Sequence, residues 1–365
     1  MKKQPNPAAS SAASGVHASP AASGGNRARI LGLDLARLLA IVGMVIVHAA
    51  TDLVMLPQER LQPEADVPWP TSPEWAYWFQ VLFANRARPL FILLAGVGIS
   101  LLVTRKGIRR RELVLRAIYL ALLGILLVAA GWSDIVLCLY GIMFLLSTLL
   151  LRASQPVLLI LAALLLAAPL PFVEAGATQQ SAETALNIMI VLSQTAYFIL
   201  GMSIGRLRLG ERSATCTLWL AGAVLAVPGL AHLQYWTGSI QVMDVTSWLD
   251  FAAAQFSTAG CCLLALAACL TLGRSEGSLT QRMLRPLAVT GGMSLTVYVA
   301  HALLYTYLSH YVTFQLQQAM LVSFSYLIAA ILLTNLWRAL GRQGPLEQLM
   351  RFVSQPKKRR EESSS

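Results

Sequence analysis

Three ionisable residues, Asp34, Arg37 and His48, stand in the first long apolar stretch of the sequence, residues 30–51. Ionisable side chains inside a membrane span are costly, so each is a functional-site hypothesis by default. Arg37 and His48 are eleven residues apart, which is about three turns at ~3.6 residues per turn. We therefore expect one polar stripe, with the guanidinium and the imidazole about 16 Å apart along the helix axis.

Asp34 precedes Arg37 by three residues, a spacing at which two side chains of one helix can pair. Such a pair would make this end of the helix tolerable to a membrane, and direct contact with a substrate is the alternative. His48 lies in the apolar sequence VIVHAA, where a polar ring needs a partner. We therefore favour a functional role for His48 over a purely structural one.

Two more arginines, Arg86 and Arg88, stand just before Pro89 in the second apolar stretch, residues 78–104. Residues two apart do not share a helix face. We therefore expect at most one of these arginines to point at the stripe, and the other to extend toward lipid headgroups.

A second histidine of interest, His301, falls in the apolar stretch 286–307. Its expected depth in the membrane matches that of His48, so the two imidazoles could converge. The alternative is that His301 is a hydrogen-bonded core residue. Asp134 marks the outer mouth of the apolar stretch 135–151.

The composition predicts the architecture that must position these residues. The 365 residues are 56% hydrophobic and 12% charged, whereas soluble domains have about 25% charged residues. We therefore expect an all-α, polytopic membrane bundle of about ten transmembrane helices. The predicted spans are 30–51, 78–104, 112–131, 135–151, 156–172, 187–204, 214–234, 250–272, 286–307 and 317–337.

Lys and Arg residues predict the orientation of the bundle. Arg60 is the one basic residue in a clear outer loop, and the clusters near Arg105–Arg111, Arg206–Arg212 and Arg274–Arg285 share the other side. This positive-inside pattern places both termini in the cytoplasm. We expect a disordered tail at 1–28, a transmembrane domain at 29–338 and a basic cytoplasmic tail at 339–365.

Several classes of protein are disfavoured by the same reading. The net charge of +11 follows membrane topology, so we expect no nucleic-acid partner. The sequence contains no P-loop or H-E-x-x-H motif, and no carboxylate cluster suited to a metal. We therefore expect no metal cofactor.

The motif around the polar stripe resembles the start of the acyltransferase-3 family of membrane acyltransferases. It combines an L-D-x-x-R opening with R-x10-H spacing, here Leu33, Asp34, Arg37 and His48. In that family the arginine and the histidine are needed for acyl transfer. The later segment SLTVYVAH is similar to the family's S-x-x-x-Y-x-x-H segment, which maps onto Ser294, Tyr298 and His301.

Other stretches resemble a sister group, the YeiB-like family (domain of unknown function 418). These are GWSDIVLCLYGI, MSLTVY and above all WRALGRQGPLEQLMR at Trp337–Arg351. Heparan-α-glucosaminide N-acetyltransferase belongs to the same broad superfamily. YeiB-like members usually have asparagine in place of His48, so this chain looks more like an active acyltransferase than they do.

The resemblance implies transfer of an acyl group, most simply acetyl, from cytoplasmic acyl-CoA to a hydroxyl or amine of an envelope glycan, lipid or metabolite. His48 and His301 would be catalytic, and His48 would act as a general base or as an acylated carrier. The donor would be bound by Asp34, Arg37, Arg86 and Arg88.

The implied location is a plasma (inner) membrane, in a bacterium, with lipids as neighbours and the oligomeric state open. Two other readings remain: a multi-pass transporter and a non-catalytic membrane protein of the same fold. Proton-coupled carriers commonly have internal repeats, and the sequence has no second D-x-x-R-x10-H stripe.

Overall fold

The computed structural model describes residues 30–61, 70, 72–107, 109–167, 179–236, 248–275 and 277–354, and this part of the chain contains helices and turns but no strand. The predicted tail at 1–28 lies outside it. The helices are α1 (Leu31–Ala50), the π-helix η1 (Thr51–Met55), α2 (Leu56–Leu61), α3 (Glu74–Phe83), α4 (Ala87–Lys106), α5 (Arg110–Ala129), α6 (Val136–Leu150), α7 (Gln155–Ala167), α9 (Gln179–Ile204), α10 (Arg212–Trp236), α11 (Trp248–Gly273), α12 (Ser278–Gly291), α13 (Ser294–Tyr311), α14 (Leu316–Ala339) and α15 (Pro345–Ser354).

Helices lie at all ten predicted positions, but fewer of them are long enough to span a bilayer. Six are long and apolar enough in the described residues, or seven if the bent pair α12–α13 counts as one span. Three apolar helical segments are too short: α6, α7 and Ile188–Ile204 of α9. Helices α6 and α7 have 15 and 13 residues, which at ~1.5 Å per residue is about 20 Å, short of the roughly 30 Å hydrocarbon core. The part of the chain that the structure describes is therefore all-helical, with six or seven candidate spans, as expected of an integral membrane protein.

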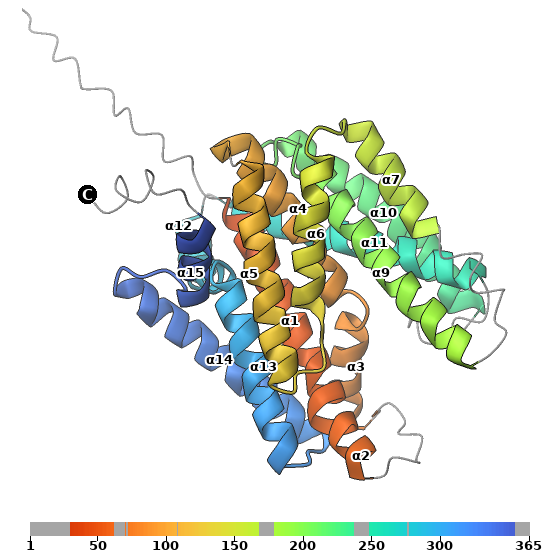
Figure 1. The fold of residues 1–365 in the computed structure, drawn as a ribbon, viewed down its shortest axis with the longest axis vertical. Helices are drawn as coiled ribbons and strands as arrows, with labels where there is room; N and C mark the ends of the chain where they lie inside the picture. The colour runs from red at the N-terminus through yellow and green to blue at the C-terminus, as the bar shows by residue number, and fades with distance from the viewer. Residues whose placement is uncertain are drawn as a thin grey trace, which may run out of the picture.

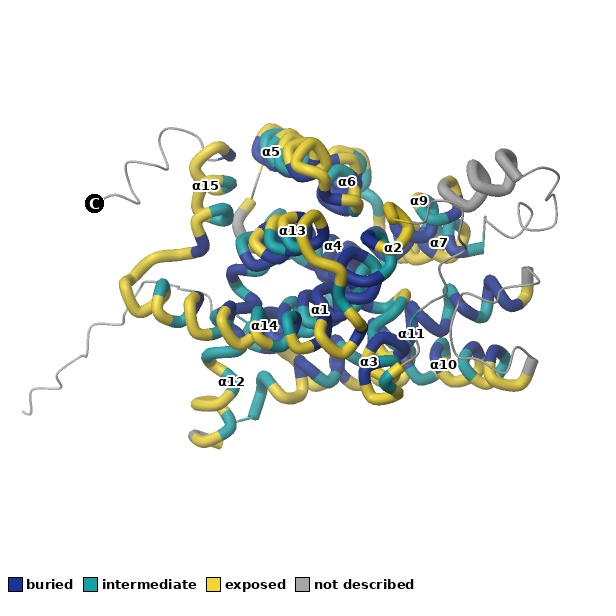
Figure 2. The backbone as a smooth tube through the Cα atoms, turned by 90° about the horizontal axis from the view of Figure 1, so that it is seen from below, coloured by how far each residue is buried: buried dark blue, intermediate teal, exposed yellow. Residues whose placement is uncertain are grey.

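Helix α1 lies in the middle of the bundle. It contacts α3, α4, α11, α12, α13 and α14, and Figure 2 shows it as a mostly buried segment surrounded by these helices. Glycines allow the close approach: a Cβ on Gly291 of α12 would overlap the carbonyl of Asp34. The stripe predicted on this helix is thus inside the protein.

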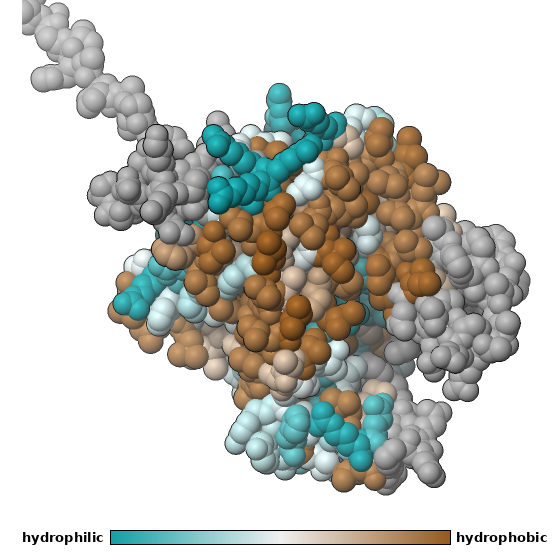
Figure 3. All heavy atoms as spheres, in the orientation of Figure 1, coloured by the Kyte–Doolittle hydropathy of each residue, from teal (hydrophilic) through white to brown (hydrophobic). Residues whose placement is uncertain are grey.

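The bundle has an apolar middle and hydrophilic ends. Figure 1 shows α7, α9, α10 and α11 on one side of α1, with α12 to α15 on the other. In the same orientation, Figure 3 shows a broad band of hydrophobic side chains between two hydrophilic ends. One of these ends includes the exposed Arg109–Arg111; we call it the Arg37 end, and the opposite one the His48 end.

The helix that carries His301 begins at a sharp bend. Helices α12 and α13 meet at 65°, and the first backbone amides of α13 are bound by a side chain from α15. Oε1 of Glu347 accepts hydrogen bonds from the amides of Leu295 at 2.8 Å and Thr296 at 3.1 Å. The segment predicted as a basic tail, 339–365, thus includes a helix that packs against α5 and α13, and its residues from 355 on lie outside the described part.

Candidate active site

The structure brings His48 and His301 into contact. Nδ1 of His48 and Nε2 of His301 lie 3.0 Å apart. The two rings are nearly parallel, with an interplanar angle of 8° and centroids 5.3 Å apart. Both side chains are buried. The structure thus shows that the two imidazoles converge and that His301 is a hydrogen-bonded buried residue, and its catalytic role stays a prediction.

The pair lies where α1 changes its geometry. His48 is in the last turn of α1, and the π-helix η1 follows directly. A π-turn widens a helix locally and frequently marks a functional site. Helix α13 is tied to this turn, since the hydroxyl of Tyr305 donates to the carbonyl of Val45 at 3.2 Å.

Aromatic rings surround His301. The rings of Trp132, Tyr298 and Tyr305 meet it edge-on, with centroids 5.4, 5.0 and 5.6 Å away. Nε1 of Trp132 also donates to the hydroxyl of Tyr298 at 3.3 Å. These contacts fix the ring plane and enclose the imidazole in apolar surface.

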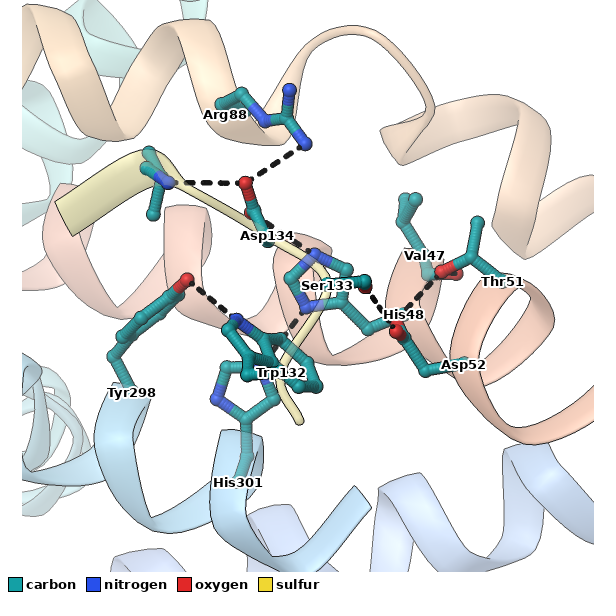
Figure 4. A network of polar contacts seen from close by, with 11 residues as sticks. Val47, His48, Thr51, Asp52, Arg88, Trp132, Ser133, Asp134, Tyr298 and His301 are labelled. Atoms are coloured by element: carbon teal, nitrogen blue, oxygen red, sulfur yellow. Dashed lines mark hydrogen bonds and ion pairs between the residues drawn. The ribbon is translucent and has the colours of Figure 1, made fainter. Parts of the chain in front are cut away.

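The connection between α5 and α6 supplies three consecutive contacts to the site (Figure 4). Trp132 packs edge-on against His48, with centroids 4.9 Å apart. Ser133 donates to Oδ1 of Asp52 at 2.7 Å, and Thr51 donates to Oδ2 of the same carboxylate at 2.8 Å. This connection therefore holds the end of α1 in place through contacts with His48 and Asp52.

Asp134 completes the arrangement around His48. Its Oδ2 lies 3.5 Å from Nε2 of His48, and its Oδ1 lies 3.3 Å from the guanidinium of Arg88. The amide of Val136 also donates to Oδ1 at 3.1 Å. Burial opposes ionisation, but Arg88 and His48 outweigh it and lower the pKa of Asp134 to about 2. The carboxylate is thus negative at neutral pH.

The two arginines of the second predicted span point in different directions, although Arg86 lies outside the helix that the prediction assumed for both. Arg88 is in the first turn of α4 and reaches Asp134, whereas Arg86 precedes α4 and donates to the carbonyl of Val81 at 2.8 Å. The predicted span 78–104 is broken between α3 and α4, and this break sends the two side chains in different directions. Arg88 is thereby linked to His48 through Asp134.

At the Arg37 end, the predicted pair is present. NH1 of Arg37 lies 2.8 Å from Oδ1 of Asp34, whose side chain is 3% exposed, against 30% for Arg37. The structure thus shows the ion-pair alternative. Contact of either residue with a donor molecule stays a prediction.

Several site residues were missed from the sequence. Trp132 and Ser133 fall in the stretch GWSDIVLCLYGI that resembles the YeiB-like family, but the sequence analysis gave them no role in the site. Asp52 did carry a signal, because it follows His48 by four residues and so shares its helix face. No group of three or more His, Cys, Asp or Glu in the described residues is arranged to hold a metal ion.

The sequence of the chain matches two known protein families. Residues 29–237, more than half of the chain, match the family described as heparan-alpha-glucosaminide N-acetyltransferase, catalytic. The chain belongs to this family. Residues 205–357 of this N-acetyltransferase family member also match a family described as protein of unknown function (DUF418), so the resemblance noted in the sequence is confirmed. No curated protein and no solved structure matches the chain.

The two matched regions divide the site between them. His48, Arg88 and Asp134 lie in the N-acetyltransferase match, and His301 lies in the DUF418 match. The contact between the histidines therefore joins the two halves of the chain.

Proposed function

We propose that this protein is a membrane-embedded acyltransferase that moves an acetyl group from acetyl-CoA to a hydroxyl or amine acceptor. The observation that carries the proposal is the buried contact between His48 and His301 at 3.0 Å, in a chain of an N-acetyltransferase family. Buried imidazoles held by a carboxylate are suited to proton transfer.

The donor would enter from the Arg37 end. The guanidinium of Arg37 is 30% exposed and offers paired donors to phosphate oxygens. The exposed Arg109–Arg111 lies at the same end and would attract the phosphates of CoA. The extended arm of the donor would then follow α1 over the roughly 16 Å to His48. The cytoplasmic side is the expected one, because basic residues gather there.

The chemistry is acyl transfer from a thioester. A neutral imidazole takes the proton of the acceptor as the acceptor oxygen or nitrogen attacks the thioester carbonyl, and the C–S bond breaks. The proton then passes to the CoA thiolate, so the products are an acyl ester or amide and free CoA. In the covalent variant, a histidine nitrogen is acylated first and then passes the acyl group to the acceptor.

The acceptor would be reached from the His48 end. With both termini in the cytoplasm this end faces outward, and its candidates are an envelope glycan, a lipid or a small metabolite. The proposed location is the inner membrane of a bacterium, with membrane lipids as neighbours.

The test uses membranes that contain the full chain and radiolabelled acetyl-CoA. We expect label transfer to a glycan, lipid or metabolite with wild type, and its loss with His48→Ala. The control is His310→Gln, a histidine of α13, the helix that carries His301; its Nδ1 donates to the carbonyl of Thr306 at 2.7 Å. Equal labelling by wild type, His48→Ala and empty membranes would overturn the proposal.

The bend between α12 and α13 favours a second candidate, a transporter. Interrupted helices are common in transporters, where they occur in matching positions of two repeats. The described residues contain one such bent pair, at 65°. Uptake of a labelled metabolite that depends on His48 without acyl transfer would support transport instead.

A further inference from the structure

A chain of two polar contacts joins Asp134, His48 and His301, and it ends on Nδ1 of His301. The chain runs from Asp134 to Nε2 of His48 at 3.5 Å, and from Nδ1 of His48 to Nε2 of His301 at 3.0 Å. Both ends of this chain, Oδ2 of Asp134 and Nδ1 of His301, are buried and make no hydrogen bond of good geometry among the described residues. Figure 4 shows this nitrogen pointing away from His48. A buried polar atom without a partner calls for a functional explanation.

The carboxylate decides which nitrogen of His48 carries hydrogen. An ionised carboxylate can only accept hydrogen bonds, so Nε2 of His48, which faces Asp134, must hold the N–H. In a neutral imidazole the other nitrogen is then an acceptor. Nδ1 of His48 therefore has a lone pair directed at His301.

The pairing of one donor with one acceptor also sets the tautomer of His301. Because Nδ1 of His48 accepts, Nε2 of His301 must donate across the 3.0 Å contact. Nδ1 of a neutral His301 is then left with a free lone pair. With a hydrogen on that nitrogen instead, the ring would face the backbone carbonyls of Val297 and Tyr298, and Nε2 of His301 would have to accept from His48.

We infer that Nδ1 of His301 is the nitrogen that reacts, and that Asp134 is a positioning residue that holds the tautomers of both histidines. This inference rests on the proposed acyl transfer. It reverses the order expected from the sequence, in which His48 was the base, because the free lone pair lies at the far end of the chain of contacts.

Every proton in the reaction can be followed along this chain of contacts. Nδ1 of His301 takes the proton of the acceptor as the new C–O or C–N bond forms and the C–S bond of the donor breaks. The hydrogen on Nε2 of His301 can shift to Nδ1 of His48, which places the positive charge on the ring beside Asp134. The reverse shift returns the proton through Nδ1 of His301 to the CoA thiolate.

The tautomers can be observed directly. The full chain, labelled with ¹⁵N-histidine and placed in lipid bilayers at neutral pH, is studied by solid-state NMR, and His48→Gln and His301→Gln identify the two sets of signals. We expect hydrogen on Nε2 and none on Nδ1 in both rings. A protonated Nδ1 on His301 in the wild-type protein would overturn the inference, whatever the variants do.

The positioning role is tested by Asp134→Asn. An amide can present either an oxygen or an N–H to His48, so we expect mixed tautomers and label transfer lowered by about 10²-fold or more. The matched control is Asp250→Asn, which removes the carboxylate of a second Asp–His pair, 2.8 Å from His232, and should keep transfer within about twofold of wild type. Unchanged tautomers and transfer in Asp134→Asn would overturn the role.

The proposed function and the role of Nδ1 of His301 are distinguished by different outcomes. If the wild-type rings carry hydrogen on Nε2 but no acyl-CoA yields label transfer, the proposed function fails and the reacting role fails with it. If label transfer depends on His48 while Nδ1 of His301 is protonated, the function stands and the inference alone is wrong.

Discussion

The carboxylate of Glu347 binds Thr296 twice, through the backbone amide at 3.1 Å and through the hydroxyl at 2.6 Å. Thr296 lies in the first turn of α13, and Glu347 comes from α15. A helix N-terminus attracts negative charge and leaves amides unsatisfied. Glu347 therefore anchors the start of the helix that carries His301, after the bend from α12 has broken the chain of backbone hydrogen bonds.

Removing this anchor should destabilise the protein. We expect Glu347→Ala to lower the free energy of unfolding by about 1–3 kcal/mol, because charged hydrogen bonds to α13 are lost, and Glu347→Gln to lower it less. Unfolding in detergent followed by tryptophan fluorescence measures this. The control is Glu211→Gln, an exposed residue that pairs with Arg208. A Glu347→Ala variant as stable as the control would contradict the anchoring role.

Acid should weaken the protein through Asp134. Its pKa of about 2 in the folded state lies below the ordinary value of 3.8. Ionised Asp134 therefore stabilises the fold above about pH 4, by about 2 kcal/mol, and this is lost as the pH falls through about 2. We expect the stability difference between wild type and Asp134→Asn to be present near pH 6 and to close near pH 2. A difference that is constant over this range would refute the assignment.

Loss of Arg88 should impair transfer through Asp134. Arg88 contributes the positive charge 3.3 Å from Oδ1 of Asp134. In Arg88→Gln the pKa of Asp134 should rise, and we expect the rate of label transfer to fall about tenfold, which is ~1.4 kcal/mol in the barrier. The exposed Arg208 provides the control variant Arg208→Gln. Equal rates for the two variants would show that Arg88 plays no part in the site.

Arg37 should act on donor binding. If its guanidinium binds phosphate oxygens, Arg37→Gln should raise KM for acetyl-CoA about tenfold or more and change kcat less. Initial rates over a range of acetyl-CoA concentrations separate the two constants. A lower kcat at unchanged KM would assign Arg37 to the ion pair with Asp34 alone.

Local features of the fold were predictable from the sequence because they depend on neighbours along one helix. The Asp34–Arg37 pair follows from a spacing of three residues, which any helix places on one face. The all-helical class follows from long apolar runs, which must satisfy their backbone groups internally in a membrane. The divergence of Arg86 and Arg88 was expected from a spacing of two on one helix, but it arises from the break between α3 and α4, because Arg86 precedes α4.

The count of spanning helices was less predictable. Apolar runs at 135–151 and 156–172 suggest two spans, but their helices α6 and α7 are only 15 and 13 residues long. Hydrophobicity places a segment among apolar neighbours without deciding how far its helix extends.

By itself, then, the sequence determined an all-helical membrane protein with a polar stripe on its first helix and a histidine at a matching depth on a late one. Only the tertiary structure decided that His48 meets His301 and that Asp134 lies behind His48. These contacts join α1, α13 and the α5–α6 connection, which are far apart in the sequence. Their directions depend on the bend before α13, the π-turn after His48 and the packing of α1 against its neighbours, none of which is encoded in residue spacing along one helix.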